Sequence, residues 1–171
     1  IDFMIILKKL NLKKDINQKY KSWMNDREVH KYSAQRLVNH TLNSIKNYVK
    51  KINNSKNEFL FGIFIKNKNK FNHIGNIKIG PINYFYKTAY ISYFIGEKDL
   101  WKKGLGAKAI KEIIKIAKKK NIKKLKAGFV KINPASMKVL EKNGFKREGV
   151  LKSEEEHNNK RCDAYIYGKV L

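Results

Sequence analysis

The sequence predicts an α/β (α+β) fold, with an early group of strands followed by strands that alternate with helices. Short runs of β-branched and aromatic residues indicate the strands, and longer segments with apolar residues at helical spacing indicate the helices. A chain of 171 residues with 42% hydrophobic content can bury one core. We therefore expect a single domain over residues 4–171, with the first three residues outside it.

The first half of the chain predicts two helices and four strands in antiparallel order. The strand patterns are short and rich in Ile and Phe, and each helix pattern places its apolar residues on one face. The predicted elements are a strand at 4–10, helices at 13–24 and 41–52, and strands at 59–66, 73–79 and 89–96, with a hairpin loop at 67–72.

The segment from Leu100 to Ala107 (L-W-K-K-G-L-G-A) joins the strand at 89–96 to a long helix. From Leu105 onward, apolar residues occupy one face of this helix and lysines the other. Glycines let a backbone approach a phosphate closely, and the N–H groups of a first helical turn have no partners within the helix. The segment therefore predicts either an anion-binding turn or an ordinary connection between a strand and a helix.

A second motif follows a short strand pattern at 124–130 (K-L-K-A-G-F-V). Asn133 is a favoured N-cap and Pro134 suits the first helical position, so we expect a helix to begin there. Gly144 stands where a left-handed C-terminal cap belongs, and Phe145 opens another strand.

The two motifs, W-K-K-G-L-G-A and N-P-A-S-M-K-V-L-E-K-N-G-F, together resemble the GNAT (Gcn5-related) N-acetyltransferase superfamily. They are most similar to the branch that includes the ribosomal-protein N-terminal acetyltransferases, and the resemblance covers about residues 75–171. It implies a mixed, mostly antiparallel central sheet of about seven strands flanked by helices. In that fold the strands at 89–96 and 124–130 splay apart at the cofactor site.

By the same resemblance the cofactor is acetyl-CoA, whose pantetheine arm lies between the splayed strands and pairs with exposed strand backbone. Its pyrophosphate would rest on the backbone N–H groups of residues 102–107. The family pattern has Gln or Arg where Trp101 stands, and Asn133 matches a cofactor-binding asparagine, with N-capping as its alternative role. The cofactor-binding residues implied are Tyr93, Phe94, Ile95, Lys102, Lys103, Gly104, Leu105, Gly106, Ala107, Asn133 and Ser136.

Direct attack of an amine on a thioester needs a neutral amine, a polarised carbonyl and a proton for the departing thiolate. Many GNAT enzymes supply that proton from a tyrosine, but its position here is Leu140, and Ser136 is the replacement we predict. Many relatives also carry a Glu at the position of Tyr90. The catalytic candidates are Ser136, Tyr90 and His73, with Asp26, Glu148, His157 and Asp163 as alternative bases.

The lack of an obvious base favours an acceptor amine of low pKa. An α-amine with a pKa of roughly 7.8 loses only about 1 kcal/mol to protonation at pH 7, whereas a lysine amine near 10.4 loses about 5 kcal/mol. Amino-sugar amines, which have electron-withdrawing oxygens nearby, belong with the α-amines.

The acceptor side of the cleft is predicted from the segment W-M-N-D-R-E-V, which resembles a segment of the same branch. Aromatic, amide, carboxylate and guanidinium groups together suit a small polar ligand. An alternative is that Asn25 and Asp26 cap a short helix while Trp23 packs in the core. The substrate-binding candidates are Trp23, Asn25, Asp26, Tyr32, Gln35, Arg36 and Asn76.

The formal net charge of +25 arises almost entirely from lysine, since only four of the 39 basic residues are arginine. A joint excess of Lys, Asn and Ile indicates codon bias, whereas a functional explanation is the attraction of anionic coenzyme A, nucleic acid or the ribosome. The lysines are spread along the chain and arginine is scarce, so we expect no nucleic-acid partner. Cys162 is alone and no run of 18 apolar residues occurs, so we expect no metal site, no membrane partner and a cytoplasmic protein. The family resemblance implies a homodimer as a further expectation, because dimers are common among relatives.

These observations predict an acetyl-CoA-dependent N-acetyltransferase that acts on an amino sugar or a nucleotide-linked amino sugar. The alternative acceptor is a protein N-terminal amine, as in the ribosomal branch. A hypothesis of another class is a non-catalytic, basic RNA- or ribosome-associated module on the same fold, which the residues at positions 90 and 140 keep open.

Overall fold

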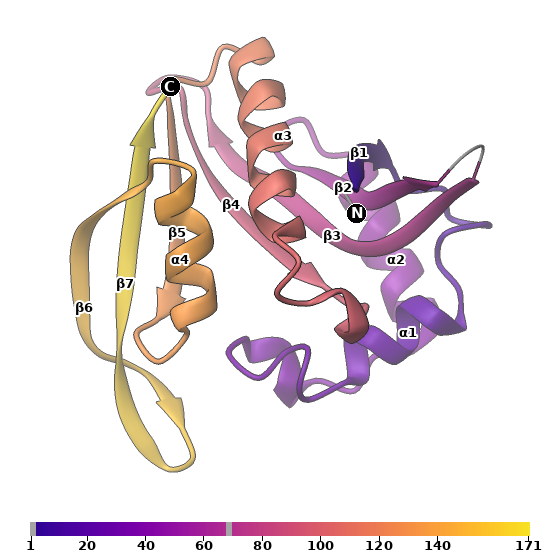
Figure 1. Cartoon of the computed structure of the whole chain (residues 1–171), viewed down its shortest axis with the longest axis horizontal. Helices are drawn as coiled ribbons and strands as arrows, with labels where there is room; N and C mark the ends of the chain where they lie inside the picture. Colours follow the sequence, from indigo (N-terminus) through magenta and orange to yellow (C-terminus); the bar gives the residue numbers. More distant parts are fainter. Residues whose placement is uncertain (1–2, 68–69) are drawn as a thin grey trace.

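The computed structural model describes residues 3–67 and 70–171. In this part of the chain seven strands form one sheet in the order β1-β2-β3-β4-β5-β7-β6, and only the neighbours β4 and β5 run parallel (Figure 1). The mixed, mostly antiparallel fold that the sequence predicts is confirmed. The elements are β1 (Met4–Lys9), α1 (Gln18–Asn25), η1 (Ala34–Leu37), α2 (Leu42–Asn53), β2 (Phe59–Asn67), β3 (Lys70–Asn83), β4 (Thr88–Ile95), η2 (Lys98–Leu100), α3 (Leu105–Lys119), β5 (Lys124–Val130), α4 (Pro134–Lys142), β6 (Lys146–His157) and β7 (Lys160–Val170).

Helices cover both faces of the sheet and divide the core in two. On one face α3 and α4 pack over a large cluster that contains Ile63, Ile77 and Ile110, all fully buried. On the other face α1 and α2 pack over a smaller cluster around Trp23 and Val49 (Figure 1). The alternation of side chains along β2 feeds both clusters, as expected for a strand that is covered on each side.

Three predicted boundaries are wrong for local reasons. The first helix begins at Gln18 and not at residue 13, because the Asn11 side chain accepts hydrogen bonds from the Lys13 and Lys14 N–H groups and forms a separate turn. Strand β3 continues past Pro81 to Asn83. A proline is possible there because the pairing of β3 with β2 stops at Ile79 and the register of β3 with β4 shifts after that residue.

The third boundary concerns the hairpin predicted at 67–72. Residues 70–72 belong to β3 and Asn67 closes β2, while the tip at 68–69 lies outside the described residues. Phe3, which was expected to precede the domain, packs against the larger core cluster.

Strands β4 and β5 part after only three paired positions. Thr88, Ala89 and Tyr90 pair with Lys124, Leu125 and Lys126, and the pairing stops there. Beyond this point β4 remains paired with β3 as far as Ile95, and β5 remains paired with β7 as far as Val130. The inner edges of both strands therefore face a V-shaped gap, as the family resemblance implies.

Candidate functional site

A single cavity of about 990 Å³ extends from the connection between α1 and α2, across the parted strands, to α4. Its wall includes backbone and side chains of β4 and β5 where their pairing has ended, so the gap between the strands is part of the same space. The predicted site residues that line it are Tyr32, Gln35, Arg36, Asn76, Tyr93, Phe94, Asn133 and Ser136.

The glycine turn lies at the end of β4 and starts α3. Lys102 and Gly104 both have positive φ, at 62° and 75°, and Gly104 is the N-cap of α3 without a side-chain cap. The first turn of α3 contains no acidic residue, and Lys102 and Lys103 are exposed. A Cβ at Gly104 would meet no atom within 4 Å, so open space lies over the turn. These properties fit an anion held by helix N–H groups.

Gly106 has a different role, which is to make room for Tyr93. A Cβ at Gly106 would lie 3.0 Å from Cε2 of the Tyr93 ring, closer than a side chain tolerates without movement. Glycine at this position therefore allows a tyrosine of β4 to lie against the first turn of α3.

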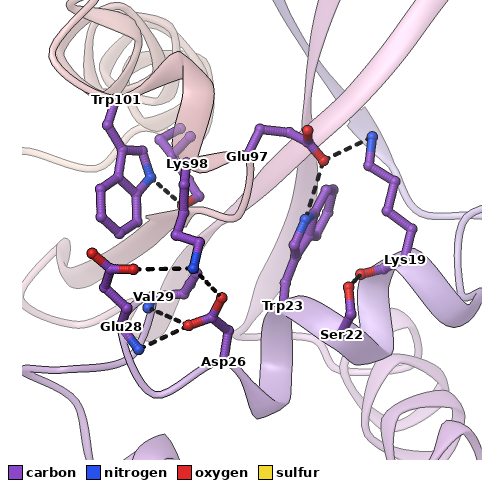
Figure 2. A network of polar contacts seen from close by, with 10 residues as sticks. Lys19, Ser22, Trp23, Asp26, Glu28, Val29, Glu97, Lys98 and Trp101 are labelled. Carbon is purple, nitrogen blue, oxygen red and sulfur yellow. Dashed lines mark hydrogen bonds and ion pairs between the residues drawn. The ribbon is translucent and has the colours of Figure 1, made fainter.

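Trp101, which replaces the family's Gln or Arg, anchors the turn. Its indole Nε1 donates a hydrogen bond to the Ile95 carbonyl oxygen at 2.9 Å (Figure 2). Ile95 is the last residue of β4, so this bond fixes the start of the turn to the strand that borders the gap.

Asn133, Ser136 and Tyr93 meet on the α4 side of the cavity. The Asn133 side chain accepts from the Ser136 N–H at 3.1 Å and donates to the Ser136 hydroxyl at 3.0 Å, so its predicted capping role is confirmed. Burial raises the pKa of the Tyr93 phenol to about 12, and an interaction with the Ser136 side chain opposes that rise. Two hydroxyl groups, both protonated at neutral pH, therefore face this part of the cavity.

On the acceptor side, Asn76 and Arg36 contribute fixed polar groups. Asn76 is 2% exposed and donates to the Tyr20 hydroxyl, whose pKa is raised above its usual range by burial. Arg36 donates to the Ser33 carbonyl and to the Glu156 carbonyl of β6, both at 2.8 Å. Among the described residues Arg36 forms no ion pair with a carboxylate, so its charge is available to an anionic ligand.

Three residues that were predicted to contact the substrate do not line the cavity. They hold the loops that surround it. Trp23 is 5% exposed, lies against Gly96 and donates to Glu97 at 3.2 Å (Figure 2). Asp26 pairs with Lys98 at 2.8 Å and accepts from the Glu28 N–H, and these contacts lower the pKa of its carboxyl. Their direct contact with a substrate stays a prediction.

Asn25 is the third. Its side-chain oxygen accepts from the His40 N–H at 2.8 Å, and its amide donates to the His40 carbonyl at 2.9 Å. The residue closes the long loop between α1 and α2.

Two catalytic candidates also lie outside the cavity wall. Nε2 of His73 is 2.9 Å from both the Gly75 carbonyl and Oδ1 of Asn76, and burial lowers the pKa of the imidazole. Because both partners are acceptors, Nε2 carries a proton and cannot take another. Tyr90 is 40% exposed at the closed end of the gap, beneath the ammonium of Lys126.

The remaining alternative bases each have a partner of their own. Glu148 pairs with Lys124 at 2.8 Å, and His157 lies 3.2 Å from Glu155. Asp163 accepts from the Ser153 N–H and pairs with Lys152, and the pKa of its carboxyl is lowered by these contacts.

Two residues that sequence reasoning missed, His30 and His40, line the cavity. The Nε2 atom of each is buried and has no hydrogen-bond partner in the described part of the chain. Neither histidine belongs to a recognisable motif, and only the folded loop between α1 and α2 brings them together.

The parted strands, the uncapped glycine turn and the Asn-capped helix together define a GNAT-type domain. The family model described as an acetyltransferase (GNAT) domain matches residues 5–146, so the chain belongs to the GNAT acetyltransferase family. Within the described residues, no helix is long and apolar enough to span a membrane and no group of three His, Cys, Asp or Glu side chains could hold a metal ion.

Three known proteins illustrate the relationship. The acetyltransferase YwnH of Bacillus subtilis (strain 168), whose name assigns it phosphinothricin only provisionally, is 34% identical over 87 residues, 51% of this chain and 53% of YwnH. The chain thus spans about half the length of this curated relative. Two solved structures share the fold. Spermidine N-acetyltransferase from Vibrio cholerae, with CoA and spermine, is 20% identical with a TM-score of 0.84 over 97% of this chain and 95% of that one. The ribosomal L7/L12 α-N-protein acetyltransferase RimL, with coenzyme A, is 17% identical with a TM-score of 0.83 over 98% and 94%.

Proposed function

We propose that this protein is an acetyl-CoA-dependent N-acetyltransferase that acetylates a primary amine by direct attack. The observation that carries the proposal is the parting of β4 from β5 after Tyr90, with the uncapped N-terminus of α3 at the open end. Strand edges without partners can pair with an extended amide-containing chain, and helix N–H groups can hold its phosphates. Acetyl-CoA has both parts.

The residues present fit this donor. The pyrophosphate would be held by the N–H groups of residues 102–107, where the backbone is glycine-rich and the nearby side chains are cationic. The pantetheine would lie along Tyr93–Ile95, whose inner edge has no strand partner. When bound, acetyl-CoA supplies an activated thioester carbonyl and a thiol leaving group.

Ser136 and Tyr93 are the groups we propose for stabilising the departing sulfur. A coenzyme A thiol resembles Cys, with a pKa of roughly 8.5, so the thiolate is a modest base. Tyr93, with a pKa of about 12, keeps its proton and acts as a hydrogen-bond donor, and Ser136 is oriented by Asn133 for the same purpose. Neither has to lose its proton for the C–S bond to break, because the amine loses a proton as the amide forms and this proton balances the thiolate's charge.

For the acceptor we propose an amino sugar or a nucleotide-linked amino sugar. The carboxylates and imidazoles that the sequence offered as general bases are paired or lie away from the cavity, which favours an amine that is partly neutral at pH 7. The acceptor half of the cavity offers hydroxyl, amide and imidazole groups as well as Glu155 and Glu156, and Arg36 has a charge suited to a nucleotide's phosphates. Cys162 is unpaired, which suits a reducing compartment such as the cytoplasm.

A protein N-terminal amine is the second candidate. The exposed side chains of Leu37 and Val38, 77% and 51% accessible, lie on the rim of the cavity and could contact an extended peptide. An α-amine also satisfies the requirement for a low pKa.

The test is an assay of thiol release from acetyl-CoA with a panel of free amino sugars, nucleotide amino sugars, polyamines and peptides with free N-termini. We expect turnover with the amino sugars to exceed that with the polyamines. A preference for peptides would support the second candidate. Turnover with none, together with RNA binding at physiological salt, would support a non-catalytic module instead.

A further inference from the structure

Two imidazoles of the acceptor half have nitrogen atoms without partners. His30 is 4% exposed, and Nε2 of both His30 and His40 is buried without a hydrogen bond in the described residues. Buried polar atoms in native proteins are nearly always paired, so an exception calls for an explanation such as a missing ligand. Both residues form part of the cavity wall.

The backbones of both histidines are held firmly, which leaves only their rings unsatisfied. The His30 N–H donates to the Asp26 carbonyl at 3.1 Å, and its own carbonyl accepts from Ser33 at 2.9 Å. The His40 backbone is held by the two hydrogen bonds from Asn25. Asn25 is therefore a positioning residue for His40, although the sequence suggested a direct substrate contact.

His30 also lies against the strand that borders the gap. Its ring makes an edge contact with Phe94, with centroids 5.0 Å apart. Phe94 lies in the part of β4 that has separated from β5. A group bound to His30 would thus be close to the part of the cavity where we place the pantetheine.

The His30 imidazole is uncharged at neutral pH. Burial, reinforced by the proximity of His40, lowers the pKa of His30 to about 4, and Asp26 opposes this only weakly. A neutral imidazole nitrogen either donates or accepts, depending on its tautomer. A hydroxyl group does both, so it can satisfy either tautomer, whereas an ammonium group can only donate.

We infer that His30 and His40 are a recognition site for hydroxyl groups of the acceptor, so that the amine is carried by a polyhydroxylated framework. The inference rests on the proposed function and names the substrate class more narrowly. Rotating either imidazole by 180° about χ2 exchanges the positions of Nε2 and Cε1, and the ring still fills the same volume. The nitrogen can therefore face a ligand on either side of the ring.

The kinetic test compares D-glucosamine with glycinamide, a primary amine of similarly low pKa without hydroxyl groups, in the full chain and in His30→Phe and His40→Phe. A site that hydrogen-bonds a hydroxyl discriminates strongly against an analogue that lacks it. We expect each substitution to raise the KM for glucosamine at least tenfold, to change the kinetics with glycinamide far less, and to leave the KM for acetyl-CoA unchanged. Equal losses for both amines, or an unchanged KM for glucosamine, would overturn the inference.

Stability separates a ligand-binding role from a structural one. Replacing an unpaired buried nitrogen by an apolar ring removes an unfavourable group, so His30→Phe should not lower the melting temperature. His73→Phe is the matched control, because His73 loses two hydrogen bonds and should melt lower. If His30→Phe melted at a much lower temperature than the unsubstituted chain, the ring would have a structural role and the inference would be overturned.

A binding measurement distinguishes failure of the inference from failure of the proposed function. The chain contains four histidines, so the imidazole signals in an NMR spectrum can be assigned with single substitutions. With coenzyme A present, glucosamine should shift the signals of His30 and His40 but not that of His73. If glucosamine shifted the signals of His30 and His40 but no amine were acetylated, the proposed reaction would be refuted and the hydroxyl-recognition site would still be supported. The absence of shifts would refute the site, whether or not turnover is seen.

Discussion

The indole of Trp101 and the carbonyl of Ile95 are joined by a hydrogen bond of 2.9 Å, which ties the glycine turn to the end of β4 (Figure 2). Both halves of the proposed donor site, the unpaired strand edge and the α3 N-terminus, meet at this bond. A residue that departs from the family pattern at a phosphate-contacting position therefore has a structural role in the same site.

Trp101→Phe keeps the aromatic ring and removes the N–H donor. We expect a loss of about 1 kcal/mol in the free energy of unfolding, the usual contribution of one hydrogen bond, and a several-fold weaker affinity for acetyl-CoA. Denaturant unfolding and calorimetric titration measure the two effects. Trp23→Phe is the control, because it removes a comparable bond to Glu97 on the acceptor side and should lower stability alone. Equal affinities for acetyl-CoA in the two variants would contradict the anchoring role.

Gly104→Glu should abolish the rise in melting temperature that acetyl-CoA causes. The site has room for a side chain, so the main effect is the carboxylate's repulsion of the pyrophosphate. Both this variant and Gly104→Gln lose about 1 kcal/mol of stability, because a φ of 75° is unfavourable for any residue with a Cβ. We expect the Gln variant to retain much of the shift. If acetyl-CoA raised the melting temperature of the Glu and Gln variants equally, charge at the turn would have no effect on acetyl-CoA binding.

Ser136→Ala should lower kcat about tenfold or more while acetyl-CoA binds nearly as before, because the hydroxyl acts on the departing thiolate and not on the bound thioester. Tyr93→Phe should behave in the same way, and the double variant should lose less than the product of the two effects, since the groups interact. Stopped-time assays of thiol release give kcat and KM. Full activity in both single variants would limit these residues to packing and capping.

His30 makes stability depend on pH. Its pKa is about 4 in the folded chain against an ordinary value of 6.5, so the unfolded chain binds more protons between these values. Stability is therefore fully present above pH 6.5 and falls as the pH decreases toward 4. We expect His30→Phe to recover about 1–2 kcal/mol of the loss between pH 7 and pH 5, measured by urea unfolding. An unchanged pH dependence would show that His30 is not desolvated.

The part of the site that the sequence predicted depends on local structure. The strand, glycine turn and helix, and the Asn133 cap with Pro134, are fixed by residues within a few positions of one another. The gap between β4 and β5 was implied by resemblance alone, since nothing in either strand's composition shows where their pairing ends.

The acceptor half depends on distant contacts that local patterns do not encode. Trp23 packs on Gly96, far along the chain, so an aromatic residue that suited a ligand lies in the core. Asn25 holds His40, and the histidines that face the cavity carry no motif. The start of α1 was misplaced because Asn11 forms a competing turn, which helical periodicity does not reveal.

The most direct test of the account is a crystal structure of the chain with coenzyme A. We predict that the pyrophosphate lies within hydrogen-bond distance of the backbone N–H groups at residues 104–107 and that the pantetheine pairs with β4 between Tyr93 and Ile95. Coenzyme A bound elsewhere, or a gap between β4 and β5 that stays closed to it, would contradict the account.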